Sequence, residues 1–269
     1  MVKRTLTGAI VATLIYLWLF LSHIPAVLYC GTAILCLLSI QELYGVCGIK
    51  KTWVFVASWI AAAVILVLPI PSYEWISLLV FIAAVFIFAL IMLQLRDVTL
   101  KEEWKAVGIA LLLVLLFKTF PSLYNAENGM HYLTFAVTAC FVTDVAAFLF
   151  GRSLGAHKLA PNISPNKTIE GAAGGLLATV MVAMIAAVIL NRCFTVQFDA
   201  VSLVIWSVLV SVAGQFGDLC MSSVKRVFGV KDFGNILPGH GGILDRFDSH
   251  IFAVSFTLIF CSLTGGFIL

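Results

Sequence analysis

Long apolar runs that are nearly free of charge follow one another along the whole 269-residue chain. A helix needs about 20 mainly apolar residues to cross a bilayer. Because these runs are continuously apolar rather than alternating, they exclude transmembrane β-strands. We therefore expect an all-α integral membrane protein with about nine transmembrane helices. The predicted spans lie near 5–22, 25–46, 53–71, 76–95, 104–121, 130–151, 170–191, 201–226 and 247–268.

The composition excludes the other broad classes of protein. Apolar residues make up 62% of the chain and charged residues 11%, against about 45–50% and about 25% in soluble domains. So few polar residues cannot cover a surface in water, which excludes a soluble enzyme, a disordered chain and a coiled coil. A net charge of +3 gives no support for a nucleic-acid partner. The seven cysteines include no CxxC pair, which argues against a disulfide framework or a zinc site.

The basic residues predict the orientation of the chain in the membrane. With about nine spans and a cytoplasmic N-terminus, only Lys118 and Arg192 fall on the far side, leaving 14 of the 16 Lys and Arg residues on the cytoplasmic side. Membrane proteins concentrate positive charge on that side. We therefore expect a cytoplasmic N-terminus and a C-terminus on the opposite side. As a separate expectation, the protein is assigned to a bacterial inner membrane.

The polar residues divide this single membrane domain, 1–269, into two parts. Residues 1–125 carry few polar groups and are predicted to be mainly a helical scaffold, with Glu42 at a membrane interface. Residues 130–269 are predicted to hold the catalytic helices and two cytoplasmic loops, 152–169 and 227–246.

Two aspartates interrupt apolar runs near their cytoplasmic ends. Asp144 lies within FVTDVAAFLF and Asp218 within VAGQFGDLCM. A carboxylate in hydrocarbon costs about 2.5–3.5 kcal/mol on insertion scales, so each should face a polar cavity or a cation. A buried ion pair that fixes helix register is the alternative for either residue alone. Two such residues at the same end of their spans favour a shared site.

The second cytoplasmic loop and its flanking helices collect groups suited to a nucleotide. Asp218, Ser222 and Lys225 are spaced i, i+4 and i+7, which places them on one helix face. Asp245 and Asp248 follow the loop and offer the hard oxygen ligands that Mg²⁺ prefers. Glycines between the two groups leave backbone N–H groups open to anions. This combination is typical of a site for a nucleoside triphosphate and its metal.

The first cytoplasmic loop is also basic, and Lys167 lies in what we predict to be a turn before the next span. Charge placed by membrane topology, together with a helix cap, is the alternative explanation for this loop. The chain contains no Walker A, HExxH or GxSxG motif. P-loop, zinc protease and α/β-hydrolase chemistry therefore have no support.

The motifs of both loops resemble those of the phosphatidate cytidylyltransferase family. From Ser222 to Asp248 the chain carries SxVKR, KDxG, LPxHGG and DRxD in the family's order. The segment 144–171 is similar to a second characteristic region, with a mild departure in the three residues after Asp144. The match at the level of motifs covers roughly 144–171 and 214–249.

This resemblance implies that CTP and phosphatidic acid react to give CDP-diacylglycerol and pyrophosphate. It also implies Mg²⁺, with two cations in the site, access from bilayer lipid, and a homodimer. We expect Asp218 and Asp245 to hold the metal, with Asp144 and Asp248 as further ligands or supports, and Lys225 to take part in catalysis. The expected substrate-binding residues are Lys167, Ser222, Arg226, Lys231, Asp232, Asn235, Gly239, His240, Gly241, Gly242 and Arg246.

Two other functions stay open at this point. A CTP-dependent lipid kinase of the polyprenol or phytol type would transfer the γ-phosphate and release CDP. A secondary transporter could use Asp144 and Asp218 as coupling-ion sites. A transporter does not require the dense Lys, Gly and Asp residues of the second loop, so we rank it below the enzymes.

Overall fold

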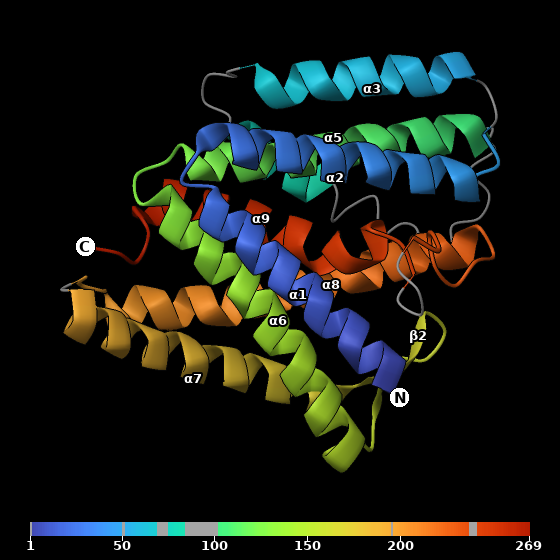
Figure 1. The fold of residues 1–269 in the computed structure, drawn as a ribbon. Helices are drawn as coiled ribbons and strands as arrows, with labels where there is room; N and C mark the ends of the chain where they lie inside the picture. The colour runs from blue at the N-terminus through green and yellow to red at the C-terminus, as the bar shows by residue number, and fades with distance from the viewer. Residues whose placement is uncertain (1, 50–51, 69–74, 84–101, 195, 237–240) are drawn as a thin grey trace.

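The structure, a computed structural model, describes the chain except for residues 1, 50–51, 69–74, 84–101, 195 and 237–240 (Figure 1). The described part is a helical bundle with one small β-hairpin. Residues 75–83 are helical. The other helices are α1 (Val2–Leu21), α2 (Pro25–Val46), α3 (Thr52–Val67), α5 (Glu102–Tyr124), α6 (Gly129–Leu154), α7 (Ile169–Phe194), α8 (Ala200–Val227) and α9 (Leu244–Thr264).

Six helices in the described ranges, α2 and α5 to α9, are long and apolar enough to cross a membrane. Two shorter apolar stretches, Gly8–Leu21 and Val54–Leu66, correspond to the first and third predicted spans. Much of the fourth predicted span, 76–95, lies outside the described residues. The all-α membrane class is thus confirmed, whereas the count of about nine spans stays a prediction.

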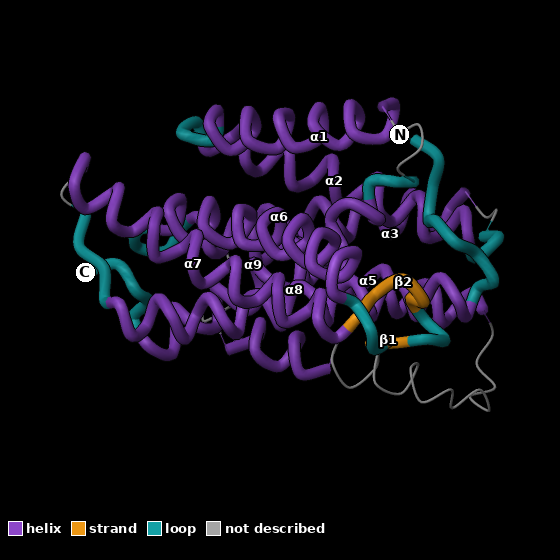
Figure 2. The backbone as a smooth tube through the Cα atoms, turned by 90° about the horizontal axis from the view of Figure 1, so that it is seen from below, coloured by secondary structure: helices purple, strands orange, loops and turns teal. Residues whose placement is uncertain are grey.

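Helix α9 lies at the centre of the bundle and contacts α2, α5, α6 and α8 (Figures 1 and 2). Its apolar window is 72% buried, against 28% for that of α7 at the periphery. The chain's N-terminus and the hairpin lie at one end of the bundle, and the C-terminus lies at the other (Figure 1). The most buried helix therefore carries its first turn to the end where the hairpin lies.

Glycines allow α6 and α7 to approach closely. A Cβ added at Gly175 would lie 2.8 Å from the carbonyl oxygen of Thr143, and one at Gly171 would lie 2.6 Å from that of Ala147. Small residues at helix interfaces are the usual way for membrane helices to pack, because lipid provides little hydrophobic drive between helices. The two glycines thus fix α7 against the part of α6 that contains Asp144.

Gly217 has the same role between α8 and α9, and we expect Gly217→Ala to lower the thermal stability of the protein. The new Cβ would lie 2.6 Å from the Phe252 ring and 2.8 Å from the carbonyl oxygen of Asp248. Overpacking of this kind costs about 1–3 kcal/mol. Thermal unfolding in detergent measures it, with Gly108→Ala as the control because a Cβ there meets nothing within 4 Å. Equal melting temperatures for the two variants would contradict this account of the interface.

The predicted loop 152–169 contains an antiparallel hairpin of β1 (Lys158–Ala160) and β2 (Ser164–Thr168). Lys158 pairs with Thr168 and Ala160 pairs with Ser164. We predicted only a turn here because the strands are short, one contains a proline, and neither alternates between apolar and polar residues. The hairpin is visible at the N-terminal end of the bundle in Figure 2.

Lys118, predicted to lie on the non-cytoplasmic side, is buried inside the bundle. Its Nζ donates hydrogen bonds to the carbonyl oxygens of Leu66 (2.9 Å) and Leu68 (2.8 Å). Both acceptors lie at the C-terminal end of α3, where helix carbonyl groups lack partners within the helix. A lysine within an apolar run therefore ties α5 to the end of α3.

Candidate active site

The last turns of α8 present the predicted polar face. The Ser222 hydroxyl donates to Asp218 Oδ1 at 3.3 Å, and the i, i+4 spacing allows this contact. Ser222 and Lys225 are buried, whereas Asp218 is partly exposed. The face predicted from the sequence is confirmed, and it points toward the first turn of α9.

A buried ion pair joins α8 to α9. Lys225 Nζ lies 2.7 Å from Asp245 Oδ1, and the two side chains are 10% and 3% exposed. The other oxygen, Asp245 Oδ2, accepts hydrogen bonds from the backbone N–H groups of Phe233 (2.8 Å) and Gly242 (2.9 Å). The Lys225 ammonium also lies 5.4 Å from the centre of the Phe233 ring. Asp245 therefore fixes both Lys225 and the loop that precedes α9.

Asp245 also corrects a predicted boundary. The predicted span begins near residue 247, but α9 begins at Leu244. The carboxylate therefore lies in the first helical turn, where helix N–H groups lack partners and negative charge is favourable.

A second ion pair lies nearer the surface. The hairpin strand β2 brings Lys167 Nζ to 2.6 Å from Asp218 Oδ2, with both side chains 26% exposed. Asp144 on α6 is within electrostatic range of Asp218, Lys167 and Arg246. Three helices and the hairpin thus contribute to one charged site.

Asp248, one turn along α9 from Asp245, completes the group of acids. It is buried and lies within electrostatic range of Asp144, Asp218 and Lys225. Its Oδ1 accepts the backbone N–H of Ser249 at 2.8 Å. Asp144, Asp218 and Asp248 are thus within electrostatic range of one another.

The carboxylates of this site could hold a magnesium ion only if other ligands complete its coordination. Among the described residues, no three His, Cys, Asp or Glu side chains converge closely enough to hold a metal. Mg²⁺ seldom needs such a cage, because one or two carboxylates, waters and substrate phosphates satisfy its six positions. Asp144 and Asp218 offer hard oxygen atoms and are not fully buried. Asp245 already accepts three hydrogen bonds.

Arg226 has a structural contact that the sequence did not predict. It is exposed at the end of α8, and its Nε donates to the carbonyl oxygen of Ile163 (3.1 Å) in the hairpin turn. Its Nη1 donates to the carbonyl oxygen of Val230 at 3.2 Å. Arg226 therefore ties to α8 the hairpin that carries Lys167.

Most of the remaining predicted substrate-binding residues lie within the described structure. Lys231, Asp232 and Asn235 are exposed, and the buried Nε of Arg246 has no hydrogen-bond partner in the described structure. Gly241 adopts φ +78°, which favours glycine, and a Cβ there would lie 2.7 Å from Asp245 Oδ2. Gly242 donates its N–H to Asp245, as described above. Gly239 and His240 lie outside the described residues.

Comparisons with known proteins assign the chain to a family. Residues 2–264 match the model of the cytidylyltransferase family. The chain belongs to this family. It is 37% identical over 266 residues to the phosphatidate cytidylyltransferase of Staphylococcus haemolyticus, covering 93% of this chain and 95% of that protein. The phosphatidate cytidylyltransferases of Staphylococcus epidermidis and Staphylococcus aureus are each 36% identical, over 255 and 259 residues, with the same coverage.

In this cytidylyltransferase, Glu42 makes contacts that the sequence did not predict. Its position at a membrane interface stays a prediction, but Glu42 is only 6% exposed and accepts the backbone N–H groups of Ile243 and Leu244. One signal was available, because Glu42 is the only acidic residue before position 74. Its partners, more than 200 positions away, could not be deduced from that signal.

Glu170 also has a defined contact in this family member. Its carboxylate accepts the backbone N–H groups of Ala156 (3.1 Å) and His157 (3.2 Å), and it lies 2.6 Å from His157 Nδ1. Glu170 is in the first turn of α7 and immediately follows the hairpin. It therefore fixes the start of the hairpin against α7.

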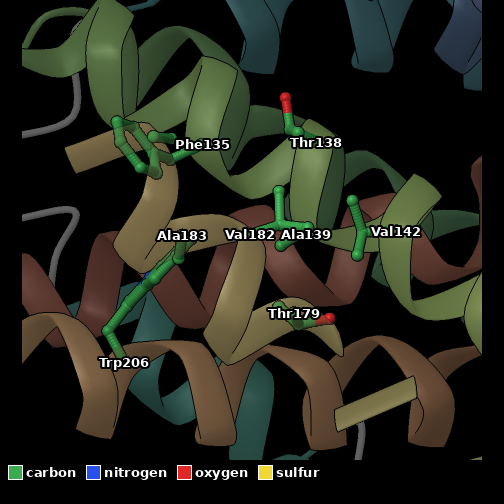
Figure 3. A pocket seen from close by; sticks show the side chains of 9 residues that line it. Phe135, Thr138, Ala139, Val142, Thr179, Val182, Ala183 and Trp206 are labelled. Carbon is green, nitrogen blue, oxygen red and sulfur yellow. The ribbon is translucent and has the colours of Figure 1, made fainter. Parts of the chain in front are cut away.

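An apolar pocket lies apart from the charged groups, between α6, α7 and α8 (Figure 3). No charged side chain lines it, so it is not the nucleotide site of this cytidylyltransferase. Thr179 on its wall bonds to Thr143 at 2.7 Å, and Thr143 directly precedes Asp144. The lining residues are Phe135, Thr138, Ala139, Val142, Thr179, Val182, Ala183, Ala186 and Trp206.

Proposed function

We propose that this chain catalyses the reaction named for its relatives, the transfer of the cytidylyl group of CTP to phosphatidic acid. The products are CDP-diacylglycerol, a precursor for phospholipid synthesis, and pyrophosphate. The observation that carries the proposal is the site itself, in which Lys167 pairs with Asp218 and Lys225 pairs with Asp245 at one end of an apolar bundle. Asp144 and Asp248 lie within electrostatic range of these groups. Charged groups at the end of an apolar bundle would let an anionic lipid from the bilayer meet a nucleoside triphosphate from water.

The proposed reaction is an in-line displacement. A phosphate oxygen of phosphatidic acid attacks the α-phosphorus of CTP and forms the new P–O bond. The bond from the α-phosphorus to the oxygen bridging to the β-phosphate breaks, and that oxygen leaves with pyrophosphate. The attacking oxygen is already ionised at neutral pH, so no general base is required. Catalysis then rests on positioning and on stabilising negative charge.

The two lysines differ in exposure, and this suggests different roles. Lys167 is partly exposed on the hairpin, so its ammonium can contact the triphosphate or the lipid phosphate. Lys225 is held by Asp245 beneath the site and supplies a fixed positive charge. Asp144 and Asp218 would hold magnesium, with Asp248 supporting a second cation. The ions, when bound, would neutralise charge on the phosphates. A metal-ligand role for Asp245 stays a prediction.

We further propose that the end of the bundle carrying the hairpin faces the cytoplasm. The support is the distribution of Lys and Arg along the chain, which favours this side for both polar loops. CTP would then enter from the cytoplasm and phosphatidic acid from the adjacent bilayer. We also propose that the protein forms a homodimer. The support for this is the resemblance of its motifs to those of the family.

Pyrophosphate release tests the proposed function directly. We expect purified protein in detergent to release pyrophosphate only when CTP, Mg²⁺ and phosphatidic acid are all present, and EDTA to abolish release. Omission of the lipid is the matched control. Release of CDP instead would indicate a lipid kinase, and absence of both products from folded protein would refute the enzymatic proposal.

A further inference from the structure

Helix α2, in the N-terminal half of the chain, brings the Glu42 carboxylate to the active-site end of the bundle. We propose that Glu42 on α2 is a positioning residue for cytidylyl transfer, which acts through the first turn of α9. This inference rests on the proposed function. It goes beyond the sequence prediction, in which all catalytic and binding residues lie after residue 130.

Glu42 caps the start of α9, although it lies about 200 positions earlier in the sequence. Its Oε1 accepts the Ile243 N–H at 2.8 Å, and its Oε2 accepts the Leu244 N–H at 2.9 Å. The N-cap residue of α9, Ile243, makes no side-chain cap of its own. The first N–H groups of a helix require acceptors, and a carboxylate at this position also interacts favourably with the helix dipole. Glu42 therefore supplies a cap that the local sequence lacks.

Glycines on both sides of the carboxylate show how closely the loop packs on it. A Cβ at Gly234 would lie 2.6 Å from Glu42 Oε1, and a Cβ at Gly242 would clash with the same carboxylate group. The loop can therefore pack against Glu42 only because both positions lack a side chain.

Glu42 and Asp245 together take three consecutive backbone N–H groups. Asp245 accepts that of Gly242, and Glu42 accepts the next two. Asp245 also holds Lys225 in the buried ion pair. A displacement of the first turn of α9 would therefore move Asp245. The Lys225 ammonium, which is paired with Asp245, would move with it. Misplacement of catalytic groups by about 1 Å can cost about 100-fold in rate.

Glu42→Gln tests the proposal, because it keeps the size of the side chain but directs an NH₂ group at a backbone N–H. We expect the turnover number to fall by about 10- to 100-fold. Backbone amides of 241–248 should exchange with deuterium about tenfold faster, while those of α7 stay unchanged. Gln41→Ala, at an exposed neighbouring position on α2, is the control and should show neither change.

Gly234→Ala is an independent second variant, since its Cβ would displace the Glu42 carboxylate without removing it. We expect the same local increase in exchange and the same direction of change in turnover. Gly45→Ala is its matched control, because Gly45 lies on α2 one turn from Glu42 and a Cβ there meets nothing within 4 Å.

Three results would overturn the proposal: wild-type turnover in Glu42→Gln, unchanged exchange at 241–248, or equally faster exchange across α7 and α8. The last result would assign Glu42 a general structural role. The exchange measurement does not require activity. If the wild type releases no pyrophosphate, the proposed function fails, whereas exchange still decides whether Glu42 holds the first turn of α9.

Discussion

Asp218→Asn is expected to reduce pyrophosphate release by about 10²–10³-fold, the scale seen when one preorganised electrostatic group is removed from an active site. Asp218 holds Lys167 through Oδ2 and accepts the Ser222 hydroxyl through Oδ1. The amide would retain one acceptor oxygen but lose the negative charge that attracts a cation and orients Lys167. Initial rates at saturating CTP and phosphatidic acid measure the effect.

The same substitution should leave the fold almost unchanged. The ion pair of Asp218 with Lys167 is partly exposed, and exposed pairs contribute about 0–1 kcal/mol to stability. Asp199→Asn is the matched control, since Asp199 caps the opposite end of the same helix by accepting the Ser202 N–H at 3.0 Å. Asn caps helices about as well as Asp. Wild-type rates in Asp218→Asn would reject a catalytic role for this carboxylate.

Lys225→Met is expected to lower both stability and activity, because it leaves the Asp245 carboxylate without its cation. Removing one partner of a buried ion pair costs about 3–5 kcal/mol, and Asp245 is only 3% exposed. The loop and the first turn of α9 depend on the same carboxylate, so turnover should fall below detection. Thermal unfolding in detergent, followed by the release assay on the folded fraction, measures both effects.

A double substitution separates the buried charge from the chemistry. Lys225→Met combined with Asp245→Asn should regain much of the lost stability, because neither partner is then charged. It should remain inactive. Lys158→Met, at an exposed position on β1, should leave the melting temperature unchanged. A double variant no more stable than Lys225→Met would show that the ion pair is not the source of the loss.

The two lysines of the site therefore differ in what they do for the protein. Lys225 belongs to the buried frame that joins α8 to α9, whereas Lys167 reaches the site on a hairpin tied down by Arg226. A substitution at Lys167 should consequently change kinetics more than stability. Turnover and melting temperature should be measured for substitutions at both lysines. The two readouts would distinguish residues that hold the site together from residues that contact substrate.

Much of this protein is encoded in local properties of its sequence. Continuous hydropathy predicted membrane helices, and the i, i+4, i+7 spacing predicted that Asp218, Ser222 and Lys225 share a face. Both follow from the period of the helix and the thickness of the bilayer. The glycines and acids between 232 and 248 predicted a nucleotide site for a similar reason, since neighbouring residues supply its groups.

Only the tertiary structure determined which charged groups meet. It paired Lys167 with Asp218 and Lys225 with Asp245, and it placed Glu42 on the first turn of α9. These contacts join residues from 20 to more than 200 positions apart. A carboxylate can accept from any N–H or cation within reach, so its spacing in the sequence does not select the partner. That choice is made by the packing of α2, α8 and α9 around glycines that let their backbones approach.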